Sequence, residues 1–186
     1  MSASITGLSE RAKVWQVNAF FNQKIRYEED IVLWGQDDYW ATPLETLSQG
    51  RGDCEDYAIA KYFTLLELGI PSARMRLVYV FLVTRGRDIN DSRRHSHMVV
   101  AYFPRPASEP WILDNLNDDI LPADQRTDLS PIFSFGIDGL WIGTGNQASR
   151  ATFSRWQNAI ARIRQEGFVH PPAATGQLAG LAPPPD

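Results

Sequence analysis

The single cysteine of the chain, Cys54, lies where a sulfur nucleophile would be expected. It follows Gly52 and begins a stretch with the composition of a helix, ended by Gly69. A helix N-terminus carries unpaired N–H groups and a partial positive charge, which favour a thiolate and could receive the oxyanion formed at an attacked carbonyl. A lone cysteine is more often an inert core residue, so its position alone leaves both interpretations open.

Two further residues could supply the groups that such a nucleophile needs. His97 begins an alternating stretch in which His97, Val99 and Ala101 share one face of a predicted strand. Asp114 lies within the apolar residues 111–116, where a buried carboxylate requires a partner. If the two strands pair, Asp114 can reach the His97 ring, fix its tautomer and stabilise the imidazolium. From the pattern alone, a satisfied core histidine and a turn-capping aspartate are equally good interpretations.

Acidic residues surround the cysteine in the sequence. Asp53, Glu55 and Asp56 lie within two positions of it, and nearby negative charge raises the pKa of a thiol. A hard cation such as calcium would neutralise these carboxylates, whereas the simpler interpretation is that they cap the helix. Three acids of the preceding loop are either further calcium ligands or solvated side chains: Asp30, Asp37 and Asp38.

Two other residues are candidates for lesser roles. Trp40 carries an indole N–H that could act as a side-chain oxyanion donor, although a tryptophan is more often part of the core. His95 competes with His97 as the base, but it follows the polar residues Asp91 to Arg94 and is expected to face water.

The remaining pattern predicts one α+β domain over residues 8–167, followed by a disordered Pro/Ala/Gly-rich tail over residues 168–186. Helices are predicted over 8–25, 42–47, 54–68 and 151–166, from their apolar spacing, caps and terminal glycines. Ser9 is a possible cap of the first helix, and Thr42 with Glu45 indicates a capping box at the second. Strands are predicted over 76–84, 97–103 and 111–116, with a further short strand near 139–142 in an otherwise irregular region. The last two long strands are joined by a Pro-rich loop and should pair antiparallel.

Composition excludes several classes of protein. The chain has 186 residues and a formal net charge of −4, and its longest Lys/Arg cluster is the pair Arg93-Arg94, so no nucleic-acid partner is expected. No apolar run approaches the roughly 20 residues that span a bilayer. One cysteine excludes an internal disulfide and a thiolate zinc site. The first ten residues lack the basic start and apolar core of a signal peptide.

Four segments closely resemble one family, the bacterial transglutaminase-like cysteine proteinases. Its members carry cysteine on a helix start, histidine on a strand and aspartate on the next strand, and the resemblance covers roughly residues 10–165. The family implies a papain-like, transglutaminase-like fold in which the nucleophile helix packs on an antiparallel sheet. The segments are 40–45 (WATPLE), 52–62 (GDCEDYAIAKY), 97–102 (HMVVAY) and 113–116 (LDNL).

The resemblance also implies a biological role. Relatives of this kind are periplasmic, cleave a large surface adhesin near paired alanines, and thereby control biofilm attachment. They depend on calcium held by the acids that flank the nucleophile, here Asp53 and Glu55, and an inner-membrane receptor for cyclic di-GMP holds them inactive. The expected enzyme is therefore a calcium-dependent cysteine protease with the triad Cys54, His97 and Asp114.

Two alternatives remain at this point. The same chemistry could transfer the acyl group to an amine, as a transglutaminase does. The chain could instead be a non-catalytic calcium-binding or receptor-binding module, against which the intact cysteine, histidine and aspartate argue.

Overall fold

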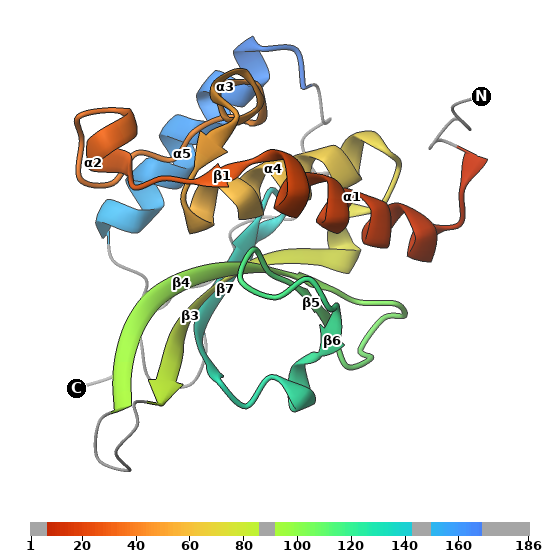
Figure 1. Ribbon diagram of the computed structural model, residues 1–186. Helices are drawn as coiled ribbons and strands as arrows, with labels where there is room; N and C mark the ends of the chain where they lie inside the picture. The colour runs from red at the N-terminus through yellow and green to blue at the C-terminus, as the bar shows by residue number, and fades with distance from the viewer. Residues whose placement is uncertain (1–6, 86–91, 143–149, 169–186) are drawn as a thin grey trace, which may run out of the picture.

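A layer of helices covers one face of a strongly curved, six-stranded antiparallel sheet (Figure 1). The structure is a computed structural model that describes residues 7–85, 92–142 and 150–168. The sheet has the strand order β6-β5-β4-β3-β7-β8, which confirms the predicted α+β class. The helices are α1 (Glu10–Lys24), α2 (Asp30–Leu33), α3 (Pro43–Gln49), α4 (Cys54–Glu67) and α5 (Arg150–Gln165), and the strands are β1 (Arg26–Tyr27), β2 (Arg51–Gly52), β3 (Met75–Arg85), β4 (Ser92–Tyr102), β5 (Trp111–Leu113), β6 (Leu121–Pro122), β7 (Leu129–Gly136) and β8 (Gly139–Ile142).

Helix α4 is the centre of the fold, between α1 and α3 on one side and β4 on the other (Figure 1). Ten of its fourteen residues are buried, so its sequence is apolar on nearly every side. The helix ends before Gly69, whose φ of 84° is a left-handed conformation that glycine adopts without strain. Because α4 cannot shift without disturbing the whole core, the residues at its first turn have a fixed position.

Two of the predicted caps, at Ser9 and Thr42, are present, whereas Asp53 makes no side-chain cap bond to α4. Ser9 accepts a hydrogen bond from the N–H of Ala12 at 3.3 Å and begins α1. Thr42 and Glu45 form a complete capping box at α3. These local signals are short-range, which is why the starts of α1 and α3 were predicted to within two residues.

The strands differ more from expectation than the helices do. Strand β4 begins at Ser92, five residues earlier than predicted, and β5 ends at Leu113 so that Asp114 lies just beyond the strand. Strand β7 was missed altogether, because Ser130 and Pro131 interrupt its apolar pattern. The pairing of β3 with β7 is shifted at this point, between Tyr79 and Val80.

A small parallel pair, β1 with β2, connects two distant parts of the helical layer. Arg26 pairs with Arg51 and Tyr27 with Gly52, and the N–H of Glu28 donates to the carbonyl of Gly52 at 3.0 Å. The segment before α2 therefore runs beside the segment before α4. This pairing brings Asp30, at the start of α2, next to the first turn of α4.

The two faces of β4 pack in different environments. Met98, Val100 and Tyr102 belong to the main core under the helices, whereas Val99 and Ala101 belong to a second apolar cluster on the outer face. The predicted alternation along this strand is therefore confirmed.

Among the described residues, no helix is long and apolar enough to cross a membrane.

The C-terminal end of the described chain contacts the core. Phe168, which the prediction assigned to the tail, packs against the ring of Phe63 with the centroids 6.3 Å apart. The other residues of the predicted tail, 169–186, lie outside the described residues.

Candidate active site

Cys54 is the first residue of α4, with Asp53 at the N-cap position. Its thiol is partly buried and donates to Oε2 of Glu55 at 2.9 Å, while the backbone N–H of Met98 is directed at the sulfur. Burial, followed by the charge of Glu55, raises the pKa of Cys54 well above its usual value. The sulfur therefore lies beside the residue that follows His97, but Glu55 works against the thiolate.

His97 and Asp114 form a buried pair. Nε2 of His97 lies 2.8 Å from Oδ1 of Asp114, and the two residues are 4% and 1% exposed. The pairing arises because β4 and β5 are antiparallel neighbours, with Val100 opposite Leu113, so that the chain after β5 passes beside His97. The structure thus brings together the histidine and the carboxylate that the sequence selected.

Arg126 is a member of this group that sequence reasoning missed. It is 5% exposed, and its Nη2 donates to Oδ2 of Asp114 at 2.8 Å and to Asp128. The N–H of Leu116 adds a third bond to Asp114, at 3.0 Å. Burial opposes ionisation of Asp114, but the bonds from His97, Leu116 and Arg126 outweigh it and lower the pKa of Asp114 to about 2. Asp114 is therefore a fully charged partner for the histidine.

Three carboxylates gather on the other side of the cysteine, and we call Asp30, Asp53 and Glu55 the acid cluster. One oxygen from each lies within 4.8 Å of the others. Burial raises the pKa of Asp30 to about 6, and burial together with the charges of its neighbours raises that of Asp53 to about 10. Burial also raises the pKa of Glu55. No cationic side chain among the described residues forms an ion pair with any of the three.

The acid cluster has the ligand oxygens that a hard cation requires. Oδ1 of Asp30 and Oδ1 of Asp53 are buried without a hydrogen-bond partner in the described part of the chain. Buried carboxylate oxygens are costly unless they are paired, and carboxylates are the ligands that calcium prefers. Asp53 makes no side-chain cap bond to α4. The simple helix-cap interpretation therefore does not account for its position.

Asp56, the third acid near the cysteine, has a structural role. Its Oδ1 accepts the N–H of Ala41 at 2.8 Å, which ties the segment before α3 to α4. A Cβ on Gly52 would lie 2.6 Å from Oδ2 of Asp56, so position 52 has no room for a side chain. Glycine is required here because the backbone passes directly over this buried carboxylate.

The other candidates occupy different surroundings. Nε1 of Trp40 donates to Oδ1 of Asp38 at 2.9 Å, and its ring stacks on Phe135 in the core, so the geometry gives no support to an oxyanion role. Asp38 also pairs with Arg155 at 3.0 Å, and Asp37 is exposed. His95 is exposed on β4, as expected. Of the three loop acids, only Asp30 joins the acid cluster.

The arrangement is suited to acyl chemistry. A thiol at a helix start lies next to a strand that carries an imidazole, and a charged carboxylate orients that imidazole. The N–H groups in the first turn of α4 have no partner within the helix, and that of Cys54 lies at the nucleophile, where an oxyanion would form.

Comparison with known proteins gives a family and a structural neighbour. The sequence profile described as bacterial transglutaminase-like cysteine proteinase matches residues 4–129, about two thirds of the chain. The solved structure of Legionella pneumophila LapG matches with 39% identity and a TM-score of 0.71 over 86% of this chain and 82% of that one.

Two further structures of the same neighbour differ in their calcium state. EGTA-treated LapG matches with 38% identity and a TM-score of 0.71, over 86% of this chain and 82% of that one. Calcium-bound LapG matches with 39% identity and a TM-score of 0.71, over 86% of this chain and 83% of that one. A search of curated sequences gave no match.

Proposed function

This chain belongs to the bacterial transglutaminase-like cysteine proteinases, and from that premise we propose that it is an endopeptidase with Cys54 as nucleophile, His97 as base and Asp114 as the orienting carboxylate. The observation that carries this proposal is the buried 2.8 Å bond between His97 and Asp114, on the strand that passes beside the start of α4. Arg126 and the N–H of Leu116 keep Asp114 charged, so that it can stabilise an imidazolium on His97.

The hydrogen bonds define the protonation states in this mechanism. Asp114 accepts the Nε2 proton of His97, so Nδ1 is the nitrogen that is free to take the thiol proton. The Cys54 sulfur then bonds to the scissile carbonyl carbon, and the C–N bond breaks as the imidazolium gives its proton to the leaving amine. Water hydrolyses the thioester with His97 again as base, which regenerates the thiol.

We also propose that the acid cluster holds calcium. Asp30, Asp53 and Glu55 would be the protein's carboxylate ligands, and backbone carbonyls or waters would complete the 6–8 oxygens that calcium takes. The ion would supply the positive charge that these buried carboxylates lack. Glu55, engaged as a ligand, would no longer draw the thiol proton toward itself. The calcium-bound form of LapG supports this assignment.

The substrate and regulation proposed here follow from the family resemblance. The enzyme would act in the periplasm and cut a large surface adhesin next to paired alanines. An inner-membrane receptor for cyclic di-GMP would hold it inactive and so control attachment.

The test uses a recombinant N-terminal fragment of the surface adhesin from the same source. With calcium present, we expect one cut beside the paired alanines, and intact-mass analysis should give two products whose masses sum to the substrate plus one water. A matched fragment with both alanines replaced by arginine should remain whole. Cleavage by well-folded Cys54→Ala protein would rule out Cys54 as nucleophile.

A further inference from the structure

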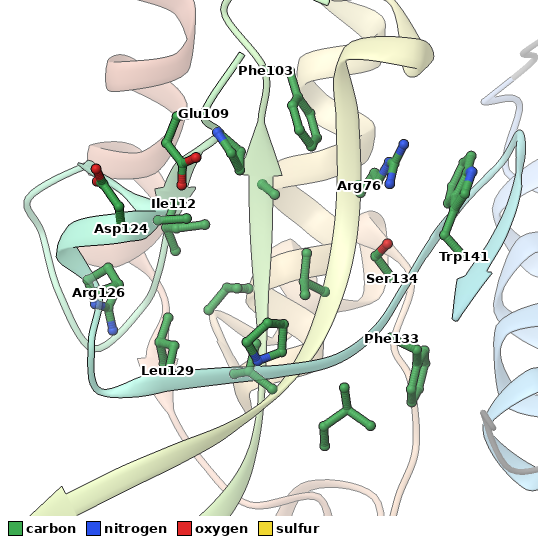
Figure 2. Close-up of a pocket in the computed structure, with 18 residues that line it drawn as sticks. Arg76, Phe103, Glu109, Ile112, Asp124, Arg126, Leu129, Phe133, Ser134 and Trp141 are labelled. Atoms are coloured by element: carbon green, nitrogen blue, oxygen red, sulfur yellow. The ribbon is translucent and has the colours of Figure 1, made fainter. Parts of the chain in front are cut away.

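The outer face of the sheet, away from the helices, contains a cavity that the proposed protease mechanism does not use (Figure 2). Its volume is about 530 Å³, within the range of small-molecule sites. The floor is aliphatic and comes from three adjacent strands, with Val78 and Val80 on β3, Val99 and Ala101 on β4, and Ile112 on β5. The curvature of the sheet makes this face concave.

One end of the cavity carries an unmatched positive charge. Arg76 lies on the same face of β3 as Val78, and its guanidinium carbon is 4.2 Å from the ring centroid of Trp141 and 5.3 Å from that of Phe103. The two rings hold the guanidinium in place. Within the described part of the chain, Arg76 has neither a carboxylate partner nor a hydrogen-bond acceptor. Its N–H donors are therefore available to a ligand.

A hydroxyl group lies at the same end. Ser134 pairs with Val78 across β3 and β7, so its side chain points to the same face as Arg76, and Figure 2 shows both lining the cavity. A guanidinium and a hydroxyl side by side provide donors suited to a carboxylate.

The other end of the cavity is different in charge. Glu109 and Asp124 line it near β5 and β6, the edge of the sheet farthest from β7 and β8, and Figure 2 shows them across the cavity from Arg76. Arg126 also lies there, but its charge is used by Asp114 and Asp128. An anion would therefore be attracted to the Arg76 end and repelled at the opposite one, which fixes the orientation of an elongated ligand.

We propose that this cavity binds a medium-chain aliphatic carboxylate, with its hydrocarbon tail on the valine floor and its carboxylate on Arg76 and Ser134. The aliphatic floor selects the tail by apolar burial, and the unpaired guanidinium selects the charged head. The site is separate from the acid cluster and does not depend on the proteolytic activity.

Calorimetric titration with sodium decanoate tests the proposal. The ligand is kept below its micelle concentration in calcium-free buffer, because calcium would precipitate it. We expect saturable binding of one molecule per chain, and at least tenfold weaker binding of the neutral analogue decanol. Arg76→Gln should weaken decanoate binding at least tenfold, whereas Arg105→Gln, at an exposed position outside the cavity, should leave it unchanged.

A second variant tests the role of the cavity itself, because it fills the floor while the charge of Arg76 is kept. Ile112→Trp fills the floor from β5, which β4 separates from Arg76 on β3, and it should abolish binding while thermal unfolding reports a folded protein. If Ile112→Trp fails to fold, Leu129→Trp, at a less buried position that lines the cavity and pairs with Leu82, takes its place. Equal affinity of wild-type and Arg76→Gln proteins, equal affinity for decanol, or heat that never saturates would each overturn the proposal.

Discussion

The two sides of Cys54 bury carboxylates in opposite ways. On the sheet side, Asp114 has bonds from His97 and Arg126, and its pKa is lowered to about 2. On the helix side, Asp30 and Asp53 have buried oxygens without a hydrogen-bond partner in the described part of the chain, and their pKa values are raised to about 6 and about 10. The carboxylate on the sheet side has a cationic partner in Arg126, whereas no described cationic side chain forms an ion pair with the acid cluster. This difference supports the proposal that the chain itself orients the base, whereas an external cation completes the surroundings of the nucleophile.

The largest expected effect comes from breaking the sheet side at His97. His97→Ala should lower kcat by about 10,000-fold, as much as Cys54→Ala, because members of a catalytic triad act as a unit. The matched control is His95→Ala on the same strand, whose side chain is exposed and whose loss should be mild. Cleavage of the adhesin fragment measures all three. A greater loss of activity in His95→Ala than in His97→Ala would show that His95, and not His97, is the base.

Removing the cation should affect only the helix side. EGTA should silence cleavage reversibly, and calcium at 100 times its Kd should stabilise the fold by about 2.7 kcal/mol. Asp53→Ala should lose activity without recovery on adding calcium, because a ligand is gone. Differential scanning calorimetry with and without EGTA reports the stability. Full activity in excess EGTA would reduce the acids to a structural feature of the helix start.

Arg126 sharpens the comparison, because it is the charge that makes the sheet side complete. Arg126→Met should lower the free energy of unfolding by about 3 kcal/mol, the size expected when a buried ion pair loses one partner. With less positive charge nearby, the pKa of Asp114 should rise, so the acid limb of the pH–activity profile should move to higher pH. Arg105→Met, at an exposed arginine, is the control. An unchanged acid limb would leave Arg126 with a purely structural role.

The smallest effect is an opposite pH dependence of stability on the two sides. The pKa of Asp114 is lowered on folding, so its stabilisation is present above about pH 4 and is lost as pH falls toward 2. The pKa of Asp30 is raised to about 6, so in EGTA its region should be most stable below pH 4 and should lose stability as pH rises through 6. Urea unfolding of wild-type, Asp114→Asn and Asp30→Asn proteins separates the two trends. Parallel curves for wild-type and Asp30→Asn protein would mean that Asp30 is already neutralised.

The features that the sequence predicted are those that depend on residues close to one another along the chain. The start of α4 and the capping box at Thr42 depend on neighbours within a few residues, and both were predicted. The contact of His97 with Asp114 followed from two strands joined by a short loop. These are near-range features, and elementary rules are sufficient for them.

Long-range features were not predictable in the same way. Asp30 could not be chosen over Asp37 and Asp38, because its position depends on the two-residue pairing of β1 with β2. Arg126 was missed because it reaches Asp114 from an irregular turn with no periodicity to identify it. In each case the decisive contact is tertiary and leaves no local pattern.

The most direct test of the difference between the two sides is a calorimetric titration of EGTA-treated, rebuffered protein with calcium. The account predicts one calcium per chain for the wild-type protein, no detectable binding for Asp30→Asn and Asp53→Asn, and unchanged binding for Asp114→Asn, whose carboxylate already has its partners. Wild-type protein that binds no calcium, or Asp53→Asn protein that binds it as tightly as wild type, would contradict the account.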